Sequence, residues 1–167
     1  IRHLPAVEAL GSTTVICSDK TGTLTENAMT VTELWTGGEA FIVDGQGYRP
    51  EGRVQHGETA VAPAPTSLHE ALLAGVLCND AALYHEHGQW QITGDPTEAA
   101  LLVVARKVGL DETTLRSVFP RHDELPFDSA RQTMATLHEV EGQPVAYVKG
   151  AIEKLLPACR AMLAADG

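Results

Sequence analysis

The feature that most constrains the fold is a short apolar run, residues 14–17, that ends at a carboxylate. This β-branched run, Thr-Val-Ile-Cys, is typical of a strand that is buried on both faces of a parallel sheet. Asp19 would then lie at the carboxyl end of the strand, where ligands bind in open α/β sheets. Lys20 supplies charge, Gly22 lets the backbone approach closely, and the neighbouring threonines offer hydroxyl donors. An aspartate after a strand is often only a turn former, but this combination indicates a site that handles phosphoryl groups.

The seven residues 19–25, Asp-Lys-Thr-Gly-Thr-Leu-Thr, resemble the phosphorylation motif of P-type cation-transporting ATPases. The resemblance implies that Asp19 is the nucleophile that takes the γ-phosphate of ATP as an aspartyl phosphate, a role that carboxylates fill in other enzymes. It also implies that Asp19 and Thr21 contact Mg²⁺ and that Lys20 steadies the phosphate. The expected catalytic residues are therefore Asp19, Lys20 and Thr21, with ATP and Mg²⁺ as cofactors.

Residues 94–98, Gly-Asp-Pro-Thr-Glu, predict the start of a helix that ends near Gly109. Asp95 suits the N-cap, Pro96 suits the first helical position, and Glu98 completes a capping box. The segment also resembles a nucleotide-domain motif of the calcium-pump-like branch of the family, which implies that Glu98 faces adenine. Since a carboxylate can accept a hydrogen bond from an exocyclic amine, we expect Glu98 to have both roles.

Two further segments resemble adenine-pocket motifs of the same family. Residues 126–131, Pro-Phe-Asp-Ser-Ala-Arg, resemble the segment in which adenine stacks on a phenylalanine, which implies that Phe127 is the platform. Lys149, Gly150 and Ala151 resemble the Lys-Gly-Ala motif at the floor of the pocket, where glycine lets a ligand approach the backbone. The expected nucleotide-binding residues are Thr97, Glu98, Phe127, Ser129, Gln132, Met134, Lys149, Gly150 and Ala151.

The sequence departs from the family pattern in places that bear on the phosphates. Ser129 and Gln132 stand where calcium pumps carry an arginine and a lysine, and Ile152 replaces the usual proline. The later Thr-Gly-Asp and Gly-Asp-Gly-x-x-Asn-Asp motifs of the family, whose carboxylates complete the Mg²⁺ site, do not occur in this sequence. We therefore expect this chain to bind adenine nucleotide weakly and to be catalytically incompetent by itself.

Charge and hydropathy exclude some partners and imply others. The net charge is −10 and no basic run occurs, which argues against binding to nucleic acid. The longest apolar runs, residues 71–77 and 99–105, fall short of the roughly 20 residues that span a membrane, so the chain itself is not expected to insert. The resemblance implies a cytoplasmic domain of a multi-pass membrane protein, with the remaining phosphorylation, actuator and transmembrane domains of the pump as partners.

The expected fold is α+β, with a twisted, mainly antiparallel sheet flanked by helices. Residues 1–28 are expected to be the leading fragment of a Rossmann-like phosphorylation domain, and residues 29–167 a nucleotide-binding domain without its last strands. The patterns of alternation, capping and turn residues predict further elements. Three hairpins are expected: residues 29–35 with 40–43, a hairpin around Gly88, and a strand that ends at Val140 and pairs with residues 145–149. The expected helices are 66–79, 112–118 and 152–163.

Cysteine and histidine patterns add little chemistry. Cys17, Cys78 and Cys159 are far apart and have apolar neighbours, so we expect reduced thiols in the core. His85 and His87 would face the same way on a strand, as a metal pair requires. No third ligand follows nearby, and an exposed hairpin edge is the preferred interpretation.

Two other classes of function remain open. Phosphatases of the haloacid dehalogenase type share the aspartate nucleophile, but they usually carry a second aspartate two residues later as general acid. Thr21 occupies that position and cannot protonate a leaving alcohol at neutral pH. The third interpretation is a non-catalytic interaction domain with vestigial motifs. Nucleotide titration distinguishes a nucleotide-binding domain of a cation pump from an interaction domain. Turnover of a phosphoester would support the phosphatase.

Overall fold

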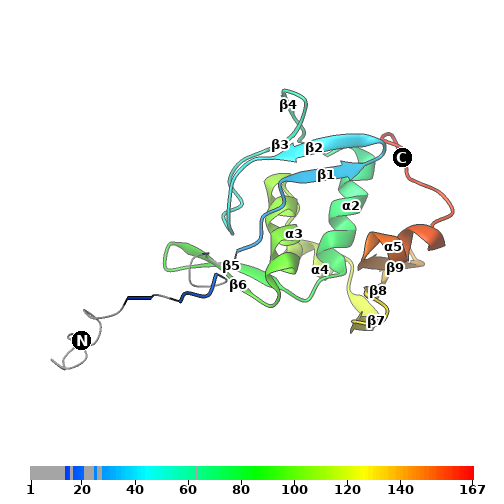
Figure 1. Ribbon diagram of the computed structural model, residues 1–167. Helices are drawn as coiled ribbons and strands as arrows, with labels where there is room; N and C mark the ends of the chain where they lie inside the picture. Colours follow the sequence, from blue (N-terminus) through cyan, green and yellow to red (C-terminus); the bar gives the residue numbers. More distant parts are fainter. Residues whose placement is uncertain (1–13, 16, 21–24, 26–27, 63) are drawn as a thin grey trace.

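Three antiparallel sheets around two central helices form the part of the chain that the computed structural model describes, residues 14–15, 17–20, 25, 28–62 and 64–167 (Figure 1). The fold is thus of the expected α+β class, with its strands divided over separate sheets. The strands are β1 (Glu33–Thr36), β2 (Glu39–Val43), β3 (Val54–His56) and β4 (Thr59–Ala60) in one sheet, β5 (Ala82–Glu86) and β6 (Gln89–Thr93) in a second, and β7 (Arg121–Asp128), β8 (Thr133–Val140) and β9 (Gln143–Gly150) in a third. The helices are α2 (Thr66–Leu77), α3 (Pro96–Lys107), α4 (Glu112–Val118) and α5 (Ile152–Leu155), followed by a 3₁₀ turn η1 (Leu156–Ala158).

Turn chemistry sets the predicted hairpins. Gly37 and Gly38 both have positive φ and join β1 to β2, and Glu141 and Gly142 do the same between β8 and β9. Such two-residue turns match the twist of the strands that they connect. The predicted hairpins are confirmed, although β1 begins at Glu33 rather than at residue 29.

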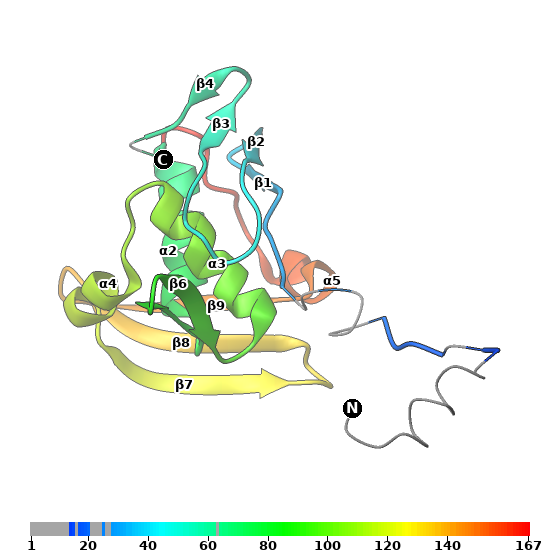
Figure 2. The same ribbon diagram turned by 90° about the vertical axis from the view of Figure 1, so that its left-hand side faces the viewer.

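Helices α2 and α3 lie side by side between the β1–β4 sheet and the β7–β9 sheet (Figures 1 and 2). The larger core joins the inner faces of both helices to Phe41 of β2 and Leu83 of β5. A smaller core lies between α2 and the third sheet and includes Leu77, Met134 and Tyr147. Because α2 contributes to both cores, it fixes the third sheet relative to α3.

Helix α4 is tied to α3 by a buried ion pair. Arg106 donates through Nε and Nη2 to the two oxygens of Glu112, at 2.7 and 2.8 Å. Glu112 is only 4% exposed, and the Arg106 guanidinium lies 5.2 Å from the ring centre of Trp90. The two charges, which are largely shielded from water, therefore pair with each other. This ion pair fixes the position of α4 beside α3.

The two faces of the third sheet differ in character. Met134, Thr136 and His138 of β8 are buried on the face toward α2 and the end of α4. The opposite face, called here the outer sheet face, carries small and apolar side chains with no described element over them. Its apolar members are Leu125, Ala135, Leu137, Ala146 and Val148, which the strand register places together, with Asp123 opposite Leu137 on the same face.

The buried strand that residues 14–17 would form in a complete phosphorylation domain is not formed by the residues that the structure describes. Thr14, Val15 and Cys17 form no strand and are exposed, Val15 by 71%. A parallel strand needs neighbours that pair its backbone and cover its faces, and none of the described strands pairs with this segment. The remaining residue of the run, Ile16, lies outside the described residues.

Three smaller predictions also need correction. Cys78 is buried as expected, but Cys17 and Cys159 are exposed. The helix predicted over residues 152–163 stops early, because Pro157 lacks the N–H that a longer helix needs. Helix α2 begins after Pro65, so neither Thr66 nor Ser67 is its cap.

None of the helices in the described part of the chain is long and apolar enough to cross a membrane.

Candidate functional site

One cavity of about 800 Å³ brings together side chains and backbone from four separate segments of the chain. Seven of the nine predicted nucleotide-binding residues line it, namely Thr97, Glu98, Phe127, Gln132, Lys149, Gly150 and Ala151. Four further residues complete the wall and were not predicted as binding residues, namely Asp80, Gly94, Asp95 and Leu101. The sequence motifs therefore converge on one concave surface.

The start of α3 forms one wall, and its cap is built as the sequence predicts. The Asp95 carboxylate accepts hydrogen bonds from the Thr97 and Glu98 amides at 2.8 and 3.3 Å, and Pro96 occupies the first turn. Burial works against ionisation, but these bonds and the charge of Lys149 together hold the pKa of Asp95 below its ordinary value. Asp95 is thus a charged cap at the cavity edge.

We expect Asp95→Ala to lower the stability at neutral pH by about 1 kcal/mol, the usual cost of an N-cap. Since the folded-state pKa of Asp95 is depressed, its contribution is present above its unfolded pKa and disappears as pH falls through the lower folded pKa. The difference between wild type and variant should therefore shrink below about pH 4. Urea unfolding at neutral and acid pH measures it, and a difference that does not change with pH would contradict the assignment.

Glu98 bridges three segments rather than closing a capping box. Its Oε2 accepts from the Asp80 amide at 3.0 Å, and its Oε1 accepts from the Lys149 ammonium. Both side chains of this ion pair are largely buried. The bond joins α3 to β9 across the cavity wall, so the acid and the cation predicted for ligand contact hold each other in place.

A β-bulge turns Phe127 toward the cavity. Leu125 pairs with Ala135, but Asp128 pairs with Thr133, so β7 carries one residue more than β8 across this interval. Regular alternation would put Phe127 on the outer sheet face with Leu125. The extra residue reverses its direction, as bulges beside functional sites commonly do, and the Phe127 ring lines the cavity while 63% exposed.

Gly150 sits at the cavity floor because the backbone of the facing turn leaves no room for a side chain. A Cβ there would lie 2.8 Å from Thr133 Cα and even closer to the Gln132 carbonyl oxygen. The same carbonyl accepts from the Ala151 amide at 3.0 Å, and Gln132 itself has a φ of 57°. The small residue at this position thus serves the packing of β8 against β9, whatever its role toward a ligand.

Two predicted binding residues lie outside the cavity lining. Ser129 is exposed in the turn between β7 and β8. Met134 is 2% exposed and packs in the core beneath the sheet. Sequence distance from Phe127 cannot distinguish these positions, because the turn and the strand alternation decide which residues face the cavity.

The two predicted phosphorylation residues that the structure describes do not line this cavity. Asp19 and Lys20 are exposed and do not line it, and Thr21 lies outside the described residues. Within the described residues no group of three or more His, Cys, Asp or Glu side chains could hold a metal ion. One exposed carboxylate does not meet the near-octahedral demand of Mg²⁺, so the described residues alone do not fit a magnesium site.

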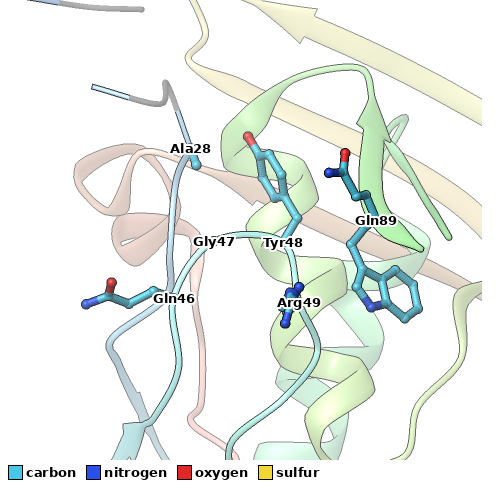
Figure 3. A pocket seen from close by; sticks show the side chains of 7 residues that line it. Ala28, Gln46, Gly47, Tyr48, Arg49 and Gln89 are labelled. Atoms are coloured by element: carbon cyan, nitrogen blue, oxygen red, sulfur yellow. The ribbon is translucent and has the colours of Figure 1, made fainter. Parts of the chain in front are cut away.

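A second cavity, of about 470 Å³, has a lining that shares no described residue with the first. Figure 3 shows Tyr48, from the loop between β2 and β3, standing between the Ala28 segment and Gln89 of β6. None of the predicted site residues that the structure describes lines this cavity. The nearby His85 and His87 are exposed at the β5–β6 hairpin, as expected, and His87 belongs to its turn.

Comparison with known proteins agrees with the fold and the convergent motifs. The family model described as "P-type ATPase, cytoplasmic domain N" matches residues 67–167. This chain therefore belongs to the P-type ATPases and contains their cytoplasmic domain N.

Similar proteins carry related names. The chain is 51% identical to the cation-transporting ATPase pma1 of Synechocystis sp., over all of this chain and 19% of that protein. It is 50% identical to the probable cation-transporting ATPase F of Mycobacterium tuberculosis, over the same shares of both chains. The calcium-transporting ATPase of Bacillus subtilis is 44% identical over 83% of this chain and 16% of its own length. The chain thus spans about a fifth of the length of these relatives.

Proposed function

We propose that the cavity beside α3 and β9 binds the adenosine part of ATP for a P-type cation pump. The observation that carries this proposal is the convergence of three distant motifs, around Glu98, Phe127 and Lys149, on one cavity. A volume of about 800 Å³ falls in the range of small-molecule sites, which run from roughly 300 to 1,000 Å³.

The chemistry of the lining suits a purine. The exposed ring of Phe127 offers a stacking surface, which is worth roughly 1 to 3 kcal/mol per base. Glu98 can accept from the exocyclic amine of adenine, and Lys149 supplies a positive charge. Among the described lining residues, the carboxylates of Asp95 and Glu98 outnumber the one ammonium, of Lys149, while the Asp80 carboxylate is paired with Arg121. This acidic wall favours the base and ribose inside the cavity and the phosphates toward its mouth.

We infer the wider activity from the family and the phosphorylation motif. In the complete protein, the Asp19 carboxylate would attack the γ-phosphorus of the bound ATP, the bond to the β–γ bridging oxygen would break and ADP would leave. Hydrolysis of the aspartyl phosphate would release inorganic phosphate and restore the carboxylate, and this cycle would be coupled to cation transport across a membrane. Residues 1–28 would belong to the phosphorylation domain and residues 29–167 to the nucleotide-binding domain. Mg²⁺ would need ligands besides Asp19 and Thr21, so we derive no step through it.

Titration with ATP tests the nucleotide site. We expect saturable changes in the amide resonances of residues 97–98, 127 and 149–151, because these residues line the cavity. Asp19→Asn should bind ATP as the wild type does, since Asp19 lies outside the cavity. Changes that gather instead at Tyr48 and Trp90 would move the site to the second cavity.

The same preparations separate the other classes of function. No change at any of these amides with saturating ATP would favour a non-catalytic interaction domain. Steady turnover of p-nitrophenyl phosphate that Asp19→Asn abolishes would favour a phosphatase of the haloacid dehalogenase type. We expect nucleotide binding without turnover from this chain.

A further inference from the structure

The loop that follows α2, residues 78–81, lies between two cavities and is held unusually firmly. Asn79 is 1% exposed, and its amide nitrogen donates to the carbonyls of Gly75 and Glu98, both at 2.9 Å. Its side-chain oxygen accepts from the Ala81 amide at 2.9 Å. One buried side chain thus ties the end of α2 to the first turn of α3.

Two arginines hold the same loop from the side away from the nucleotide cavity. Arg121 Nη2 donates to the carbonyls of Asn79 and Leu77 at 2.9 and 3.3 Å, while Nη1 donates to the Asp80 carboxylate at 2.8 Å. Arg116 Nη2 donates to the carbonyls of Asn79 and Ala81 at 2.9 and 3.0 Å.

Neither arginine lines the nucleotide cavity. Both line a separate cavity of about 300 Å³, and of the described residues around it only Asp80 also lines the nucleotide cavity. A direct contact between Arg121 and a bound nucleotide is therefore not part of this geometry. The loop is linked to the nucleotide cavity through the Asp80 amide, which donates to Glu98 Oε2 at 3.0 Å.

We propose that Arg121 is a positioning residue for the nucleotide site, acting on Glu98 through the backbone of Asp80. This inference rests on the proposed function. The planar guanidinium group of Arg121 donates to the Asp80 carboxylate and to the Asn79 carbonyl at the same time, which fixes the direction of the Asn79–Asp80 peptide group. Glu98 then keeps one oxygen on the Asp80 amide and presents the rest of the carboxylate to Lys149 and the ligand. A lysine at position 121 retains the charge but not the fork.

The test compares Arg121→Gln, Arg121→Lys and Arg53→Gln in the 167-residue chain. Arg53 is exposed and precedes β3, so Arg53→Gln removes the same charge away from the loop. We expect both Arg121 variants to bind adenosine and ATP roughly three- to tenfold more weakly, the effect of one weakened hydrogen bond. Arg53→Gln should bind adenosine as the wild type does, because adenosine is uncharged.

A double-mutant comparison of adenosine affinity distinguishes a positioning role from a general loss of stability. In a Glu98→Gln background, Arg121→Gln should cause little further loss of adenosine affinity, since its effect passes through the Glu98 carboxylate. The Asp80 amide resonance should shift in the same direction in Arg121→Lys and in Glu98→Gln. If Arg121→Gln does not fold, Arg121→Lys carries the same comparisons.

The outcomes separate the inference from the function on which it rests. A wild-type chain that binds neither adenosine nor ATP overturns both. A wild-type chain that binds both, with Arg121→Lys unchanged in affinity and in the Asp80 resonance, overturns the positioning role alone. Equal losses from Arg121→Gln with and without the Glu98 carboxylate would also overturn it.

Discussion

Gly150→Ala should destabilise the protein by about 2 to 3 kcal/mol, which is large for the addition of one methyl group. The new Cβ would lie 2.8 Å from Thr133 Cα and closer still to the Gln132 carbonyl. Both are backbone atoms, at the place where the start of β8 faces the end of β9, so no side-chain rotation can relieve the contact. Urea unfolding followed by circular dichroism measures the change.

The matched control is Gly75→Ala in α2. A Cβ at Gly75 would meet only Leu101 side-chain atoms, at 3.6 Å or more, and the backbone there is helical. We expect this variant to keep or gain stability, by up to about 1 kcal/mol, because alanine is the better helix former. Equal effects at the two glycines would mean that the close approach at Gly150 is not present in solution.

Phe127→Ala should weaken binding of adenine nucleotide by roughly 5- to 150-fold, which corresponds to the loss of one base-on-ring stack. The stability should change little, because the ring is 63% exposed and leaves no cavity in the core when removed. Calorimetric titration with ATP and thermal unfolding of the same sample measure the two quantities.

Leu125→Ala provides the comparison for Phe127→Ala. Leu125 is on the same strand and is 50% exposed, but it lies on the outer sheet face and not in the cavity. We expect its removal to leave nucleotide affinity unchanged. Similar losses from both variants would indicate that β7 as a whole is disturbed and that Phe127 is not a platform.

Local chemistry explains what could be predicted from the sequence. Helix α3 begins where Asp95 and Pro96 predict, since a cap and a fixed φ act within one turn. The turns at Gly37 and Gly142 form because few other residues adopt their positive φ. Helix α4 likewise starts after Asp111 and ends where predicted.

The direction of Phe127 could not be read from alternation, since the bulge that turns it depends on the pairing of β7 with β8. The position of Met134 follows from the same pairing, which directs its side chain into the core. The family resemblance supplies candidate binding residues, but the tertiary fold decides which of them face the cavity.

The remaining differences arise from contacts between distant segments. Nothing near Glu98 in the sequence indicates that the Asp80 amide holds it, because the two residues are on either side of a hairpin. The hydrogen bond from Arg121 to the loop after α2 joins residues that are more than forty positions apart in the sequence. The exposure of Thr14, Val15 and Cys17 is a third case, because burial of a strand depends on neighbouring strands.

We expect the outer sheet face to influence how the protein behaves at high concentration. Five small or apolar side chains lie together there beside two sheet edges that no described strand pairs, a combination that promotes self-association. The net charge of −10 opposes it by mutual repulsion between molecules. Because added salt screens that repulsion but leaves the apolar face unchanged, ionic strength sets the balance between dispersed and clustered protein.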